Sequence, residues 1–135
     1  FNRRVASHLA HSTKYYIEDR YRTLDDHLHQ LAMSHCAIAM RYHGHLFSMA
    51  LGLPFVSIDY TGKAGKVSSF VKRVGYEGCS YAWNNLYGDE ISQSMSVLLE
   101  SREQRASELR GHTDRLVAEL ELTYENVFKQ KSRML

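Results

Sequence analysis

Apolar and polar residues alternate along this chain in blocks that predict strands and helices in turn. Residues 36–40 are an uninterrupted run of apolar side chains, which is typical of a strand in the middle of a parallel sheet with helices on both faces. A helical pattern begins directly afterwards, at residues 46–51, and Gly52 followed by Pro54 ends that helix. Residues 55–58 predict the next strand of the sheet.

The same alternation continues upstream of this pair of strands. Residues 2–10 predict a helix and residues 15–18 a short strand. Thr23 and Asp26 have the spacing of a capping box, so a helix is expected from there to Ser34. The positions expected to face inward on this helix are Leu24, Leu28, Leu31 and Ala32.

Downstream of residue 58 the pattern predicts one more short helix and one more strand. A glycine-punctuated loop at residues 59–66 leads into a helical stripe, which Gly75 closes. The apolar members of this stripe are Val67, Phe70, Val71 and Val74. Residues 80–83 predict a strand, with Asn84 and Asn85 as the following turn.

From residue 89 to residue 131 the apolar positions recur at helical spacing. A helix of that length would measure about 60 Å at 1.5 Å per residue, which is too long for a small sheet to cover. We therefore expect either a break at Gly111 or packing of the far end on something outside this chain. In the second case some of these residues should be exposed: Leu116, Leu120, Tyr124 and Val127.

Strands that alternate with helices through short loops predict an α/β fold built from parallel strands with right-handed crossovers. We expect a three-layer αβα, Rossmann-like sheet in which residues 15–18, 36–40 and 55–58 are parallel neighbours. Residues 1–88 should form this core, and residues 89–135 should be a helical extension of the same domain.

Composition and charge exclude several classes of protein. A chain of 135 residues with 44% hydrophobic and 24% charged residues fits one globular domain. The net charge of +2 gives no reason to expect a nucleic-acid partner. Cys36 and Cys79 form no disulfide framework, and we find neither a signal peptide nor a run of about 20 apolar residues. We expect a cytoplasmic protein, with the inner face of the membrane as an alternative location.

The chain does not begin with Met, and it opens inside a helical pattern. We therefore expect it to be the C-terminal piece of a longer protein.

The candidate chemistry lies at the end of the apolar run 36–40. Arg41 and His43 follow a strand directly, and ligands of open α/β sheets bind at the carboxyl ends of strands, where the next helix also points its free N–H groups. Lys63 and Lys66 lie in the loop that should reach the same edge. A guanidinium, an imidazole and lysines around a helix start predict a site for a small anion such as a phosphate or a carboxylate.

Other chemistries have less support. Three pairs of residues are candidate metal ligands: His27 and His29, His35 and Cys36, and His43 and His45. Alternate residues of a helix point in different directions, however, so these spacings do not suit zinc, and we expect no metal. The chain has no nucleophile motif, no phosphate-binding G-x-x-x-x-G-K-[ST] loop and no G-x-G-x-x-G, so neither nucleotide hydrolysis nor hydride transfer is supported.

The segment that carries these residues resembles a known family. Residues 40–60 read MRYHGHLFSMALGLPFVSIDY, and Gly65-Lys66-Val67 and Gly75 follow. This order, an Arg-x-His at a strand end, a helix closing in Gly-x-Pro, a strand, a Tyr and then a Lys, is similar to the C-terminal domain of the polysaccharide pyruvyl transferases. The resemblance covers about residues 15–75. It implies one half of a two-domain, GT-B-like enzyme whose active site lies in the cleft between Rossmann-like halves.

The resemblance further implies a transferase of exopolysaccharide biosynthesis that uses phosphoenolpyruvate as donor and needs no cofactor. The acceptor would be a sugar or a lipid-linked glycan, the product a pyruvyl ketal. Arg41 and His43 match the family's catalytic residues, with His43 as either acid or base. Gly44 and Tyr60 would help to bind the donor. Either Lys63 or Lys66 would be the family's lysine, and the Gly-Lys-Val context favours Lys66.

The implied partners are the missing N-terminal domain and, through the C-terminal helix, a second copy of the chain. The isolated piece should be inactive.

Two other classes of protein stay open. One is half of a GT-B glycosyltransferase or epimerase, in which Asp59 or Glu77 would grip the ribose of a nucleotide sugar. The other is a non-catalytic module that self-associates through its last helix, although Arg102 and Thr113 interrupt the stripe that a regular coiled coil needs.

Overall fold

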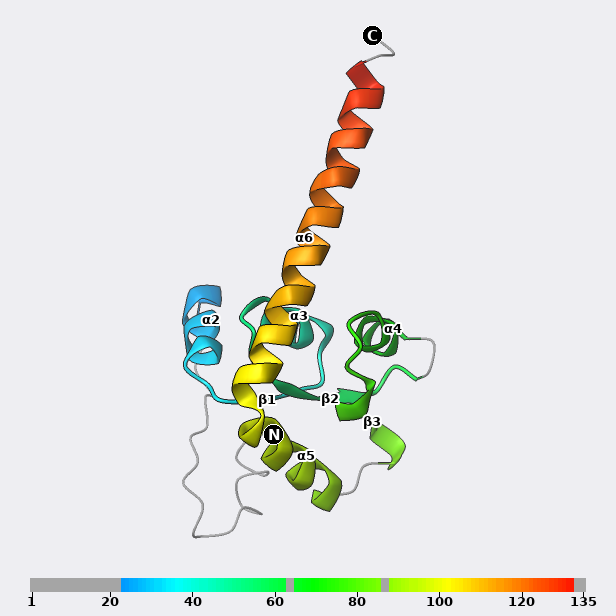
Figure 1. The fold of residues 1–135 in the computed structure, drawn as a ribbon. Helices are drawn as coiled ribbons and strands as arrows, with labels where there is room; N and C mark the ends of the chain where they lie inside the picture. The colour runs from blue at the N-terminus through cyan, green and yellow to red at the C-terminus, as the bar shows by residue number, and fades with distance from the viewer. Residues whose placement is uncertain (1–22, 63–64, 86–87, 133–135) are drawn as a thin grey trace.

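The computed structural model of the chain describes residues 23–62, 65–85 and 88–132 (Figure 1). Within them, a parallel three-stranded sheet has the order β1-β2-β3. The strands are β1 (Ala37–Ala39), β2 (Phe55–Asp59) and β3 (Ser80–Ala82). The predicted parallel pairing of residues 36–40 with 55–58 is therefore confirmed, as is the strand predicted at residues 80–83. The helix predicted at residues 2–10 and the strand predicted at 15–18 lie outside the described residues.

Helices cover both faces of the sheet. In Figure 1, α2, α3 and α4 lie on one side of the strands and α5 on the other. Two single-turn 3₁₀ helices flank β3, and a long helix, α6, follows α5. The bounds are α2 (Leu24–Ala32), α3 (Tyr42–Ala50), α4 (Lys66–Arg73), η1 (Glu77–Cys79), η2 (Trp83–Asn85), α5 (Gly88–Glu100) and α6 (Arg102–Ser132). The described part of the chain is thus an α/β unit with a Rossmann-like parallel sheet, as predicted.

The middle strand is β2, and all five of its residues are buried. The sequence predicted the middle position for residues 36–40. Their other expected neighbour, the strand at residues 15–18, lies outside the described residues, so this stays a prediction. Among the described strands, β1 pairs with β2, and Ile38 is 53% exposed. An apolar run indicates that a strand can be buried on both faces, but it does not determine which strands pair with it.

The start of α2 is the predicted capping box. The Asp26 N–H donates to Thr23 Oγ1 at 3.2 Å, and the Thr23 N–H donates to Asp26 Oδ2 at 3.1 Å. The predicted inward face of this helix is confirmed in part: Leu28 and Leu31 are the half-buried residues of α2, whereas Leu24 and Ala32 are exposed. None of the residues of α2 is fully buried.

The core joins the sheet to helices on both sides. Phe55 and Val56 of β2 pack with the predicted stripe of α4, with Leu98 of α5 and with Leu109 of α6. Tyr76, which follows α4, stacks on Phe55 with ring centroids 4.5 Å apart, and the Phe55 N–H donates to the Tyr76 hydroxyl at 3.3 Å. Burial raises the pKa of Tyr76 to about 12, so this phenol stays neutral in the core.

The long helical pattern is broken at Ser101, between α5 and α6, whereas one of the two predicted alternatives was a break at Gly111. The Ser101 N–H keeps its helical bond to the Val97 carbonyl at 3.0 Å, and the Ser101 hydroxyl donates to the same carbonyl at 2.7 Å. A serine hydroxyl bonded to the carbonyl four residues earlier often bends a helix. Gly111 stays inside α6, where a glycine costs only about 1 kcal/mol relative to alanine. The turn at Ser101 lets α5 run below the sheet and α6 cross α3 (Figure 1).

Beyond this crossing, α6 extends away from the sheet (Figure 1). Leu116 is half-buried, whereas Leu120 is 69% and Tyr124 66% exposed. The prediction that part of this apolar stripe is exposed is therefore confirmed. The side chain of Val127 lies outside the described part.

The glycines that end α3 and α4 offer a matched test of local packing. Gly52 and Gly75 both have positive φ, 63° and 66°, after their helices. A Cβ on Gly52 would lie 3.0 Å from Arg110 Cγ and 3.2 Å from the Ala106 carbonyl oxygen, whereas a Cβ on Gly75 would meet nothing within 4 Å. We expect Gly75→Ala to lower the free energy of unfolding by about 1 kcal/mol and Gly52→Ala by about 2 kcal/mol, in urea denaturation. Equal losses of unfolding free energy in the two variants would show that α6 moves away from the added Cβ of residue 52 without a free-energy cost.

Candidate anion site at the carboxyl edge of the sheet

Two strands end next to each other at the predicted edge, and their following residues meet there. Arg41 follows β1 and Tyr60 follows β2. The Arg41 guanidinium carbon lies 5.9 Å from the centroid of the Tyr60 ring, within the range of a cation–π contact. Among the residues that the structure describes, no carboxylate forms an ion pair with Arg41. The guanidinium is exposed and held by an aromatic face, which leaves its N–H groups open to an anion.

The helix start next to Arg41 adds backbone donors. Arg41 is the N-cap of α3, with extended backbone angles (φ −83°, ψ 142°), and its side chain makes no capping hydrogen bond. Gly65, the N-cap residue of α4, makes no side-chain capping hydrogen bond either, whereas α2 has a complete capping box. The N–H groups of Tyr42, His43 and Gly44 therefore have no partner within the helix. Uncapped helix starts at this edge favour negative charge.

His43 is the second residue of α3, and its side chain is exposed. Its ring lies 6.2 Å from the Tyr42 ring and 6.4 Å from the Phe47 ring, centroid to centroid. Arg41 has extended backbone angles, whereas His43 is helical. The two side chains therefore do not lie on one face of a strand, as residues two apart in a strand would. Within the described residues no hydrogen bond or ring contact joins them. Both lie at the start of α3, as the N-cap and as the second helical residue.

Of the other predicted site residues, the structure describes Gly44 and Lys66 but not Lys63. Gly44 is the third residue of α3, and a Cβ there would lie 3.6 Å from Ala39 Cβ, an ordinary contact with β1. Lys66 is exposed at the first position of α4 and lines a groove of 450 Å³ between α3, α4 and α6, with Tyr42, Phe70 and Leu116 among the other lining residues. Lys63 lies outside the described residues.

His45 is a functional candidate that sequence reasoning did not identify. It is fully buried, and its ring packs edge-on against Phe55 and Phe70. Its Nδ1 lies 2.8 Å from the Arg41 carbonyl oxygen, and its Nε2 lies 2.8 Å from Ser57 Oγ. The available signal was its position four residues after Arg41, which on a helix returns the side chain to the N-cap.

The partners of His45 define its protonation state. A carbonyl oxygen only accepts, so Nδ1 carries the proton and donates to Arg41. Nε2 then accepts from the Ser57 hydroxyl, and Ser57 Oγ in turn accepts from the Ser80 hydroxyl at 3.2 Å. Burial lowers the pKa of His45 from its ordinary value of 6.5, against the opposing effects of the Arg41 carbonyl and the Asp59 charge, so the ring is neutral at pH 7.

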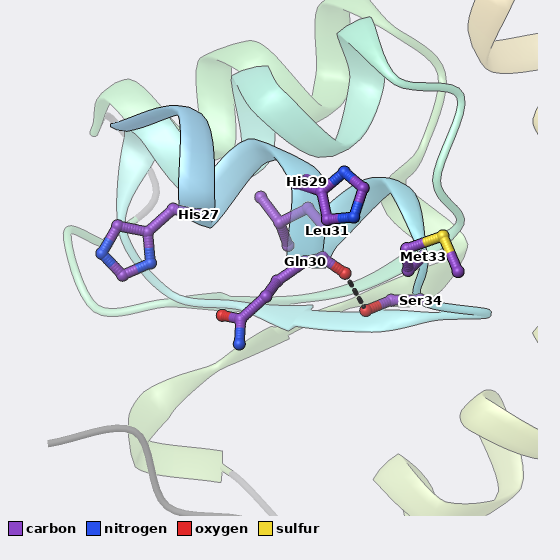
Figure 2. Close-up of a pocket in the computed structure, with 6 residues that line it drawn as sticks. All are labelled: His27, His29, Gln30, Leu31, Met33 and Ser34. Atoms are coloured by element: carbon purple, nitrogen blue, oxygen red, sulfur yellow. Dashed lines mark hydrogen bonds between the residues drawn. The ribbon is translucent and has the colours of Figure 1, made fainter. Parts of the chain in front are cut away.

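The histidines do not gather into a metal site in the described ranges. His45 is fully used by its two hydrogen bonds, and Figure 2 shows His27 and His29 leaving α2 on different sides. Among described residues, no three His, Cys, Asp or Glu side chains lie close enough to hold a metal ion.

The carboxylates proposed for a nucleotide-sugar site are placed elsewhere or already engaged. Asp59 Oδ1 accepts from the Thr61 backbone N–H at 2.7 Å and from the Thr61 hydroxyl at 2.6 Å. Glu77 begins η1, which precedes β3, so it lies toward the opposite edge of the parallel sheet. In the described part of the chain, this edge of the sheet therefore presents the Arg41 guanidinium and helix N–H groups, and the carboxylate of Asp59 beside them is engaged by Thr61.

A comparison with known protein families bears on the segment that carries these residues. The sequence model of the family described as "Polysaccharide pyruvyl transferase" matches residues 2–62, which confirms the resemblance for this part of the chain. The match includes α2, β1, α3 and β2, and with them Arg41, His43 and Tyr60. It ends before Lys63 and Lys66, so the assignment of the family's lysine stays a prediction. Neither the curated proteins nor the solved structures gave a match.

Among the helices of the described residues, none is both long enough and apolar enough to cross a membrane.

Proposed function

We propose that this chain is the C-terminal portion of a polysaccharide pyruvyl transferase and that it holds the phosphoenolpyruvate donor. The start of α3 carries the proposal: the family's Arg-x-His pattern stands where uncapped helix N–H groups meet a guanidinium that forms no ion pair with any described residue. Phosphoenolpyruvate has a phosphate and a carboxylate, and both are strong acceptors for these donors. Arg41 binds one of them, and the N–H groups of His43 and Gly44 add backbone donors.

The reaction needs a proton at a defined carbon. Protonation of the donor's methylene carbon makes C2 electrophilic, and one sugar hydroxyl adds to C2. A second hydroxyl of the sugar then displaces phosphate, so the products are a pyruvyl ketal and inorganic phosphate. His43 is exposed on the first turn of α3, and its imidazole can give the proton to the methylene carbon or take one from the attacking hydroxyl.

The remaining parts of the proposed site act through position and charge. Tyr60 holds the Arg41 guanidinium by its ring face. Lys66 supplies a point charge from the start of α4, and Lys63 is the other candidate for this role. The acceptor, a sugar or a lipid-linked glycan, would bind mainly to the N-terminal half of a GT-B-like enzyme. No resident cofactor is proposed.

The nucleotide-sugar alternative has little support, since Asp59 is bonded by Thr61 and Glu77 lies toward the other edge of the sheet. Competition would separate the two classes: phosphoenolpyruvate should bind to the full-length protein and a nucleoside diphosphate sugar should not displace it.

Arg41→Ala in the full-length protein is expected to weaken phosphoenolpyruvate binding about tenfold or more, because a charge-assisted hydrogen bond is lost. Arg41→Lys should recover only part of the affinity, since lysine cannot form two parallel bonds to one phosphate. Isothermal titration with phosphoenolpyruvate measures both. Arg102→Ala, at the exposed start of α6, is the control and should bind normally. Wild-type affinity in Arg41→Ala would refute the proposed donor site.

A further inference from the structure

We propose that His45 is a positioning residue for Arg41, which it holds in place for the anion through the proton on Nδ1. The inference rests on the proposed function and adds to it a residue that the family's Arg-x-His pattern does not include. Its basis is the buried hydrogen-bonded chain that starts at the Arg41 carbonyl and continues through His45 and Ser57 to Ser80.

The first step concerns the Arg41 backbone. The Arg41 side chain is exposed and makes no capping bond, so apart from its contact with the Tyr60 ring its position depends on the main chain. The Arg41 carbonyl accepts two hydrogen bonds from one residue, from the His45 ring Nδ1–H at 2.8 Å and from the His45 backbone N–H at 3.3 Å. The same peptide unit carries the Tyr42 N–H, the first free donor of α3. His45 thereby sets the direction of both the guanidinium stem and the helix N–H groups.

The second step concerns what holds His45. Its ring is enclosed by Phe55 and Phe70, which restrict its rotation. Its Nε2 accepts from Ser57 in the middle strand, and Ser57 accepts from Ser80 in β3. The chain of bonds thus links Arg41, two residues after β1, to β2 and β3.

Two substitutions separate this role from a structural one. An asparagine amide can place its nitrogen, a donor, near the position of Nδ1, and a glutamine amide can place its oxygen, an acceptor, near that of Nε2. His45→Asn retains the donor to Arg41, and His45→Gln retains the partner of Ser57. In steady-state kinetics of the full-length enzyme, His45→Asn should keep the KM for phosphoenolpyruvate within about threefold of wild type. His45→Gln should raise it about tenfold, with a smaller change in kcat.

The outcomes are distinct. Equal KM values for the two variants, or a larger loss in His45→Asn, would overturn the inference. If Arg41→Ala leaves the KM for phosphoenolpyruvate unchanged, the proposed function itself is refuted, and the inference that rests on it is refuted with it. An independent readout needs no variant: the ¹⁵N spectrum of the wild-type protein should show the proton of His45 on Nδ1, and an Nε2–H tautomer would overturn the inference even if both variants failed to fold.

Discussion

His43→Ala is expected to lower kcat of the full-length enzyme by about 10²-fold or more, the usual loss when a general acid or base is removed. The reason is chemical: pyruvyl transfer needs proton movement at the donor's methylene carbon and at the attacking hydroxyls. The exposed His43 ring on the first turn of α3 is the titratable side chain of the Arg-x-His pattern. The KM for phosphoenolpyruvate should change much less than kcat, in contrast to Arg41→Ala. Initial rates at varied phosphoenolpyruvate concentration give both constants.

The matched control is His27→Ala, which removes an exposed histidine from α2. It should have wild-type kcat, because His27 lines a different hollow (Figure 2). A His43→Ala enzyme with wild-type turnover would leave His43 without a part in the chemistry, whatever happened to donor binding.

Leu109→Ala is expected to destabilise the protein by about 2–5 kcal/mol, the range for a buried leucine truncated to alanine. Leu109 is fully buried in the cluster that joins α6 to the sheet. The loss combines the transfer free energy of the removed methyl groups with the cavity that rigid neighbours leave behind. Urea denaturation followed by circular dichroism measures it.

Leu122→Ala is the matched control, since it makes the same change on the same helix at a side chain that is 63% exposed. Its effect should stay within about 0.5 kcal/mol. If the two variants lost equal stability, the assignment of α6 to the core through Leu109 would be wrong.

Much of the fold around the site was predictable because local signals agreed. The apolar residues 36–40, the helix end at Gly52 and Pro54, and the strand at residues 55–58 gave the β1-α3-β2 unit and its parallel pairing. The position of Arg41 at the carboxyl edge followed from that topology alone. Local patterns do not determine which strands are neighbours, so the sequence did not predict that β2 lies between β1 and β3 in the described sheet.

The role of His45 was missed for a related reason. The sequence shows two histidines in the stretch HGH, and only the starting residue of the helix decides which one faces the sheet. The apolar pattern predicted a helix over residues 46–51, whereas α3 begins at Tyr42. With that start, His45 lies inward with Ser48 and Met49, and His43 lies outward. The break at Ser101 was missed because it depends on where α5 and α6 pack.

The geometry of α6 has a mechanical consequence. The helix is attached to the domain through residues 106–119, where Ala106 and Leu109 are buried, the Thr113 hydroxyl donates to the Met49 carbonyl at 3.1 Å and Arg73 of α4 pairs with Glu119 at 2.9 Å. Residues 120–132 continue as a lever of about 20 Å at 1.5 Å per residue. A tilt of about 10° at the attachment would displace the tip by about 3.5 Å. Because Met49 belongs to α3, the helix capped by Arg41, force applied to the lever acts on the element that positions the proposed anion site.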